Sequence, residues 1–236
     1  MPTFALDTAT ASPSLALVRD DRPIAELWLG AEPGSGRRVL EAAHGLLSAA
    51  GTSVREIDGI VVGVGPGGFT GLRIGIATAL GLGQALRVPV NGASTLEALA
   101  LGLAEVAPAG AVLVPVLDAR RRELFAAAYR SRSGDGLEEL LEPSALPPAE
   151  LARILSGLGE EAWLGGEGVE AGGDELEGPG LRRVPEGAVA HRVRAAALAR
   201  RVAAGAGLPA RPVYARLPDA EVNRLASAGA AADGQG

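Results

Sequence analysis

The sequence predicts an α/β protein built from two related halves. Short apolar runs typical of strands alternate with stretches whose apolar residues recur every three or four positions, as in a helix. A strand that ends in aspartate and is followed by a turn and a second strand occurs twice, at Asp7 and Asp118. We therefore expect a duplicated fold with subdomains over residues 1–110 and 111–225. Residues 226–236 have no apolar period, which predicts a disordered tail.

The first half begins with strands and then changes to a helical period. Alternating apolar residues and polar turns predict a meander with strands over residues 3–8, 14–20 and 24–30. Residues 37–50 follow the helical period, and Gly51 ends this helix. The other elements expected here are a strand buried on both faces over 58–65, a helix over 72–86, a strand over 88–92, and a helix whose first turn has a capping box of Ser94 and Glu97.

The second half repeats the opening motif and then becomes acidic. We expect strands over residues 112–119 and 124–130, a strand entering a turn over 161–168, and a helix over 190–204. Residues 133–187 hold 13 acidic residues and 3 arginines, a net charge of −10, so the rest of the chain sums to +4. The stretch over residues 165–180 is rich in glycine and acids, and we expect it to be a solvated loop.

The composition excludes several kinds of chemistry. All 22 basic residues are arginine, so the chain has no lysine for a phosphate loop or a Schiff base. It has no cysteine, and its two histidines, His44 and His191, are far apart in sequence, so we expect no metal site. The net charge of −6 argues against a stand-alone nucleic-acid binder. No signal peptide or membrane span is recognisable, and we expect a cytoplasmic protein.

A glycine-rich loop follows the predicted strand over 58–65. Gly63, Gly65 and Gly68 have the G-x-G-x-x-G spacing, but the next strand lacks the acid that a dinucleotide-binding fold uses to hold the ribose. We therefore reject that interpretation. A plain strand-to-helix connection remains, and so does a phosphate loop, because free N–H groups at a helix start attract anions.

The helix over 72–86 is apolar nearly all round, as buried helices are. Small residues every fourth position would let another helix approach closely, and a second apolar stripe lies beside them. These stripes are Gly75, Ala79 and Gly83, and Leu72, Ile76 and Leu80. Either the helix is covered by its own domain or one of its faces contacts a partner, and we favour the partner.

Several blocks of sequence resemble the bacterial TsaB (YeaZ) family, in the same order along the chain. They are ALDTAT near the N-terminus, GPGGFTGLRIG at 65–75, GASTLEALA at 92–100, LDARRRELFAAAY at 117–129 and PVYAR at 212–216. The resemblance implies an actin-like (ASKHA), duplicated RNase-H-type fold. It also implies a role in making threonylcarbamoyladenosine at the tRNA position next to the anticodon.

In that family the protein is a non-catalytic subunit. The resemblance implies a heterodimer with the TsaD paralogue, which holds the metal and the active site, and help in recruiting the TsaE ATPase. It also implies homodimers in isolation and contact with tRNA only through the complex, with room for ATP or ADP at the partner interface. The implied interface residues are Leu40, Ala43, Leu47, Phe69, Leu72, Ile76, Ala79 and Gly83. The vestigial phosphate-loop positions are Asp7, Thr8, Gly65, Gly67 and Asp118.

Two other functions and one charge pattern stay open. The first function is an ATP-dependent small-molecule kinase of the same superfold, in which Asp7 and Asp118 would be phosphate-hairpin acids rather than turn residues. The second is a peptidase, which would need a serine beside one of the two histidines, yet no G-x-S-x-G is present. The arginines at 120–122 and 192–201 predict a solvated basic face, with a tRNA-facing surface as the alternative.

Overall fold

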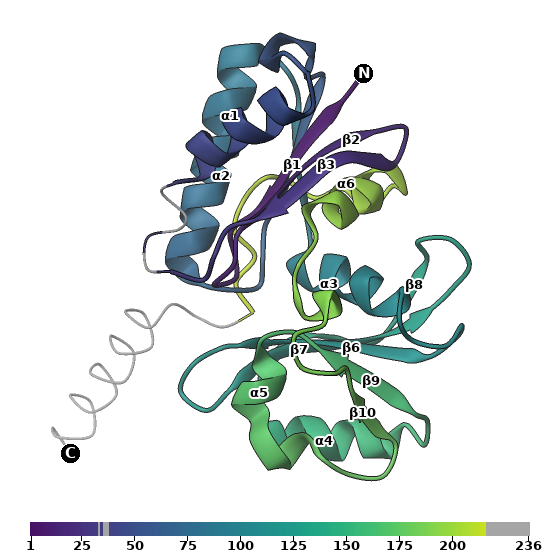
Figure 1. Cartoon of the computed structure of the whole chain (residues 1–236). Helices are drawn as coiled ribbons and strands as arrows, with labels where there is room; N and C mark the ends of the chain where they lie inside the picture. Colours follow the sequence, from purple (N-terminus) through teal and green to yellow (C-terminus); the bar gives the residue numbers. More distant parts are fainter. Residues whose placement is uncertain (33, 35–37, 216–236) are drawn as a thin grey trace, which may run out of the picture.

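Two five-stranded sheets, one from each half, form the framework of the molecule (Figure 1). The structure is a computed structural model that describes residues 1–32, 34 and 38–215. The N-terminal sheet contains β1 (Thr3–Asp7), β2 (Ser14–Arg19), β3 (Arg22–Trp28), β4 (Gly59–Gly63) and β5 (Val90–Ala93). The C-terminal sheet contains β6 (Val112–Asp118), β7 (Leu124–Ser131), β8 (Leu137–Leu146), β9 (Ala162–Gly165) and β10 (Leu181–Arg183).

The two sheets share one topology. Their strand orders are β3-β2-β1-β4-β5 and β8-β7-β6-β9-β10. In each sheet the central strand, β1 or β6, pairs antiparallel with the strand that follows it and parallel with a later one, β4 or β9. Asp7 and Asp118 end the two central strands, so the repeat seen in the sequence is a repeat of structure.

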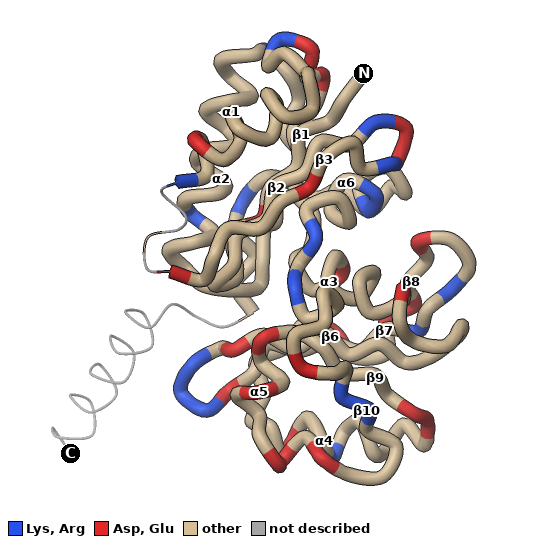
Figure 2. The backbone as a smooth tube through the Cα atoms, viewed as in Figure 1, with Lys and Arg blue, Asp and Glu red and all other residues tan. Residues whose placement is uncertain are grey.

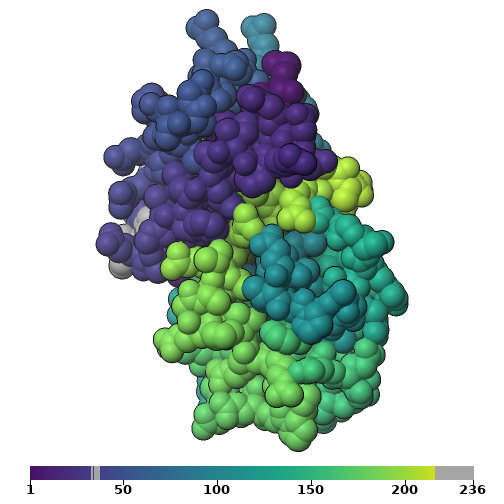
Figure 3. All heavy atoms as spheres, turned by 45° about the vertical axis from the view of Figure 1, so that its right-hand side comes forward, coloured from purple at the N-terminus to yellow at the C-terminus, as the bar shows by residue number. Residues whose placement is uncertain are grey.

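Helices form three layers around the sheets. The helices are α1 (Val39–Ala49), α2 (Phe69–Leu86), α3 (Thr95–Ala104), α4 (Pro148–Gly157), α5 (Gly168–Gly172) and α6 (Ala195–Ala203). α1 and α2 cover the outer face of the N-terminal sheet, and α4 and α5 cover the outer face of the C-terminal sheet. α3 and α6 lie between the sheets, in one core with residues from both halves. In Figure 3, α6 is the yellow-green segment that lies between the purple N-terminal strands and the teal part of the chain.

The central helices cross the boundary between residues 110 and 111, which separates the strands of the two sheets. α3 comes from the first half, yet it packs on β6, β7 and β9. α6 comes from the second half, yet it packs on β1, β2, β4 and β5. Each half therefore buries one face of its sheet with a helix from the other. The predicted tail over 226–236 lies outside the described residues.

The acidic region is more ordered than its composition predicts. Residues 133–160 supply β8 and α4, which the sequence analysis did not find. The expectation of a solvated loop over residues 165–180 is wrong, since this stretch forms α5 and the 3-10 turn η3 (Gly173–Leu176). Val169 and Leu176 are buried against the C-terminal sheet, and the acids around them face solvent. Two apolar anchors are thus enough to hold a segment whose average composition is polar.

Helix ends differ from the expectations in detail. α2 begins at Phe69 rather than at residue 72, and α6 begins at Ala195 after the 3-10 turn η4 (Val189–His191). The Ser94 side chain caps α3 by accepting from the Glu97 N–H, but Glu97 does not complete a capping box. Its carboxylate instead accepts from Arg201 at 2.9 Å.

The expectation of a solvated basic face is wrong for Arg194, Arg200 and Arg201, although Arg192 is exposed. Arg194 binds Glu26 at 2.9 Å and Glu105 at 2.8 Å, and buried Arg201 binds Glu97. Arg200 pairs with Asp135. Figure 2 marks basic segments on and before α6 in the space between the sheets. These arginines neutralise acids from both halves, because a buried charge needs a partner.

Candidate functional site

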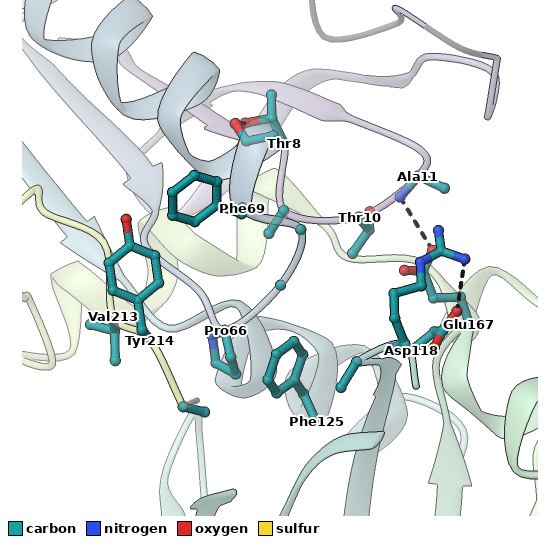
Figure 4. Close-up of a pocket in the computed structure, with 17 residues that line it drawn as sticks. Thr8, Thr10, Ala11, Pro66, Phe69, Asp118, Phe125, Glu167, Val213 and Tyr214 are labelled. Carbon is teal, nitrogen blue, oxygen red and sulfur yellow. Dashed lines mark hydrogen bonds and ion pairs between the residues drawn. The ribbon is translucent and has the colours of Figure 1, made fainter. Parts of the chain in front are cut away.

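The turns of the two equivalent hairpins face one cavity of about 480 Å³ (Figure 4). The turn between β1 and β2 supplies Thr8 and Thr10, and the turn between β6 and β7 supplies Asp118 and Arg120. The other lining residues come from the glycine-rich loop, the start of α2, the start of α5 and the last described segment of the chain. They include Pro66, Gly67, Gly68, Phe69, Gly71, Phe125, Glu167, Val213 and Tyr214.

Asp7 is fully buried beside this cavity and closes the first hairpin turn. Its Oδ1 accepts from the Ala9 N–H at 2.8 Å, and its Oδ2 accepts from the Thr95 hydroxyl at 2.8 Å. The Thr95 oxygen in turn accepts from the Gly65 N–H at 3.2 Å. Burial raises the pKa of the Asp7 carboxyl from 3.8 to about 6, although both hydrogen bonds oppose that shift.

Asp118 occupies the equivalent place in the second hairpin. Its Oδ1 accepts from the Arg120 N–H at 2.7 Å, which is the contact that Asp7 makes two residues ahead. Its Oδ2 lies 3.1 Å from the Arg120 guanidinium. Both aspartates therefore bind the backbone of their own turn, as turn aspartates do. A phosphate approaching either turn would meet a carboxylate at these N–H groups.

The glycine-rich loop is packed against the first hairpin turn. A Cβ on Gly67 would lie 2.5 Å from the Ala9 oxygen, and one on Gly71 would lie 1.9 Å from the Thr8 oxygen. The Gly68 N–H donates to the Ala9 oxygen at 2.7 Å, and the Thr8 hydroxyl donates to the Gly71 oxygen at 2.7 Å. The loop needs glycine because two backbone segments touch here, and no space for a phosphate separates them.

Of the predicted phosphate-loop positions, Thr8, Gly67 and Asp118 line the cavity, whereas Asp7 and Gly65 do not. Among the described residues no group of three or more His, Cys, Asp or Glu could hold a metal ion. Gly65 has a φ of +108°, and a Cβ there would lie 2.8 Å from the Val213 oxygen. Gly65 therefore lets the chain turn closely beneath Val213.

In the described part of the chain, neither histidine makes a hydrogen bond to a serine. His44 lies exposed on α1. The ring of His191 contacts main-chain atoms through both nitrogens: Nδ1 accepts from the Gly166 N–H at 3.1 Å, and Nε2 lies 3.0 Å from the Val184 oxygen. Both ring nitrogens are therefore engaged by the main chain, and His191 is a structural group. In the described part of the chain the peptidase geometry is missing.

The small-residue stripe of α2 faces its own sheet. A Cβ on Gly75 would lie 2.2 Å from the Thr8 hydroxyl oxygen, and one on Gly83 would lie 2.2 Å from Val90 Cγ2. Ala79 is fully buried between them. The close approach that the stripe permits is therefore used within the chain, and a large residue at Ala79 or Gly83 would disturb the fold itself.

The implied interface residues divide by exposure. Leu40 and Phe69 are 57% and 40% exposed. The others are buried within this chain: Ala43, Leu47, Leu72, Ile76, Ala79 and Gly83. Leu80, which was not among them, is 47% exposed. The exposure of Leu80 could have been read from the sequence. Each step of four residues turns about 40° past a full helical turn, so Leu80, two steps after Leu72, is rotated away from the sheet.

The repeated strand order, the crossed helices and the paired turn aspartates define an actin-like, duplicated α/β protein. Comparisons with known proteins narrow this class. The family model of TsaD, tRNA N6-adenosine threonylcarbamoyltransferase, matches residues 31–162. The tRNA threonylcarbamoyladenosine biosynthesis protein TsaB of Escherichia coli K12 is 34% identical over 173 residues, which are 69% of this chain and 74% of that protein.

The Bacillus subtilis 168 protein of the same name is 33% identical over 134 residues, and the match spans 57% of this chain and 57% of that protein. The solved structure of YeaZ from Pseudomonas aeruginosa has 26% identity and a TM-score of 0.74, and covers 90% of this chain and 99% of that one. The chain belongs to the TsaB family of tRNA threonylcarbamoyladenosine biosynthesis proteins.

Proposed function

We propose that this chain is a non-catalytic subunit of the complex that makes threonylcarbamoyladenosine in tRNA. It binds and activates a TsaD-type paralogue, helps recruit the TsaE ATPase, and meets tRNA only through that complex. The carrying observation is that the turn N–H groups a phosphate would need are already bound within the chain. Asp7 and Asp118 bind their own turns, and the glycine-rich loop lies on Ala9. A protein of this kind acts by binding partners rather than by catalysing a reaction.

The outer surface of α1 and α2 is the part that fits a partner. Leu40 on α1 and Leu80 on α2 expose aliphatic side chains on the two helices that cover the same face of the N-terminal sheet. The Phe69 ring at the start of α2 contacts the Arg73 guanidinium, whose Cζ is 3.8 Å from the ring centroid, and stacks with Tyr214 at 5.6 Å between centroids. Aromatic residues and arginine beside aliphatic surface are the usual anchors of an interface.

A charge placed on this face should break the heterodimer without unfolding the chain. We expect Leu40→Glu with Leu80→Glu to weaken binding to the paralogue at least 100-fold, on the order of 3 kcal/mol, because two apolar anchors would be replaced by desolvated charges. The matched control is Val106→Glu with Val189→Glu, which alters two similarly exposed apolar residues away from α1 and α2. Co-purification with the paralogue, isothermal titration and light scattering of the mixture measure this loss of binding.

The functional test is a tRNA modification assay with the paralogue and TsaE, with and without this chain. Modification should require the chain and should be lost with the Leu40 and Leu80 double variant but not with the control. Pull-down of TsaE by the assembled pair tests recruitment. Modification that proceeds equally well without the chain, or a double variant that binds the paralogue normally, would contradict the proposal.

A further inference from the structure

The cavity between the hairpin turns has two chemically different ends. Figure 4 shows Phe69, Tyr214, Phe125 and Pro66 toward one end, and Asp118 and Glu167 at the other. The proposed partner surface does not account for the acidic end. The cavity lies between the halves and is large enough for a long side chain or a small organic molecule.

The apolar end is an aromatic wall. The rings of Phe69 and Tyr214 stack with centroids 5.6 Å apart at an interplanar angle of 30°. They are 40% and 42% exposed. Phe125 adds a third, buried ring. Aromatic faces attract organic cations as well as apolar groups.

The polar end carries negative charge that is only partly balanced. Glu167 Oε2 accepts from the Ala11 N–H at 3.2 Å, and in the described part of the chain no cation lies within ion-pair distance of it. Asp118 pairs with Arg120, whose side chain is 83% exposed. Burial raises the pKa of Glu167 and the Ala11 hydrogen bond opposes this, while the charge of Asp118 raises the pKa by more than Arg120 lowers it. A cation bound here would remove this repulsion.

An anion is a poor fit for the same place. The N–H groups of Ala9 and Arg120 that face the turns are already bound by Asp7 and Asp118. We propose that this cavity binds an organic cation, a guanidinium or alkylammonium group whose apolar stem packs on Tyr214 and Phe69 while its head meets Glu167 and Asp118. The cation is either a basic side chain of a partner protein or a free polyamine.

The chemistry can be tested on the full chain alone, so its failure leaves the proposed function standing. Agmatine, which has a guanidinium head on an alkyl stem, is titrated into ¹⁵N-labelled protein and followed by NMR. We expect saturable shifts at Ala11 and Tyr214 with a millimolar Kd. Butylurea, which is similar in shape but uncharged, should give no saturable shift. Equal binding of both compounds would overturn the proposal.

Isosteric variants separate charge from structure. Glu167→Gln with Asp118→Asn keeps oxygen acceptors for the Ala11 and Arg120 N–H groups but removes both charges. We expect this variant to bind agmatine at least tenfold more weakly. The matched control, Glu170→Gln, neutralises an exposed neighbour that does not line the cavity, and should bind normally. Unchanged affinity in the double variant, or tight binding of MgATP that displaces agmatine, would show that the cavity is not a cation site.

A last arm distinguishes the two sources of the cation. If a partner's arginine or lysine fills the cavity, the complex with the paralogue should no longer bind agmatine, and the double variant should weaken that complex. If the cation is a free polyamine, the complex should bind agmatine as the isolated chain does.

Discussion

At the scale of single residues, Asp7 is the clearest case of a polar group whose role depends on its surroundings. Its carboxyl is buried, accepts two hydrogen bonds and has its pKa raised to about 6. A carboxyl with a raised folded pKa favours folding most when it is protonated. That contribution is complete below pH 3.8 and is lost as the pH rises through about 6.

Replacing Asp7 by asparagine should therefore change how stability depends on pH. Asparagine keeps an acceptor for the Ala9 N–H and carries no charge to bury. Relative to the natural chain, we expect the stability of Asp7→Asn to rise by roughly 2–3 kcal/mol between pH 4 and pH 7. Urea unfolding across this range measures the difference, and two parallel stability profiles would refute the explanation.

Residue roles were predictable from the sequence only where the partner lies nearby in the chain. That Asp7 and Asp118 could be turn residues follows from a strand end and a turn, and the hydrogen bonds two residues ahead agree. The partners of Arg194 and Arg201 were not predictable. Glu26 and Glu97 lie more than a hundred residues away, and sequence spacing carries no information on such pairs.

At the scale of elements, α2 contains one glycine that the packing requires and one that it does not. Gly83 faces the sheet, where a Cβ would lie 2.2 Å from Val90 Cγ2 and 3.3 Å from the Val88 oxygen. Gly81 is exposed, and nothing lies within 4 Å of a Cβ built there. The first glycine permits close packing, whereas the second only lowers helix propensity.

This difference predicts opposite effects of the same substitution. Gly83→Ala should destabilise the chain by roughly 1–3 kcal/mol, because the added methyl group overpacks the contact with Val90. Gly81→Ala, the matched control on the same helix, should stabilise it by about 0.5–1 kcal/mol through helix propensity. Urea denaturation with circular dichroism distinguishes them, and equal effects of the two changes would show that the contact with β5 is not tight.

Element prediction succeeded where the period was clear and failed where composition masked it. The strands of both hairpins were found because apolar residues mark them. β8 was missed because it is an edge strand with exposed Glu138, Glu139 and Glu142. α5 was missed because it is short, and only Val169 is a large buried side chain in it. An average over a segment hides one or two anchoring residues.

At the scale of the whole molecule, the two halves are joined by exchanged helices. α6 covers the inner face of the N-terminal sheet and α3 covers the inner face of the C-terminal sheet, so their core residues form one cluster.

No helix in the described part of the chain is long and apolar enough to span a membrane.

Cutting the chain at the boundary between residues 110 and 111 should therefore not release two folded domains. A fragment of residues 1–110 lacks α6, so the inner face of its sheet would be exposed to water. We expect residues 1–110 and residues 111–236 to show poor NMR dispersion and no cooperative unfolding when separate, and to regain structure when mixed. Cooperative unfolding of the first fragment alone would mean that α6 is not needed by its sheet.

The sequence by itself determined the duplicated α/β framework, the aspartates at the hairpin turns and the family. These depend on local period, on turn chemistry and on contiguous motifs. Only the tertiary structure decided which face of α2 is buried, which acids the arginines of α6 neutralise, and that α3 and α6 are exchanged between the sheets. Those outcomes depend on contacts between residues distant in the chain, whose positions are set by how the two sheets close around one shared core.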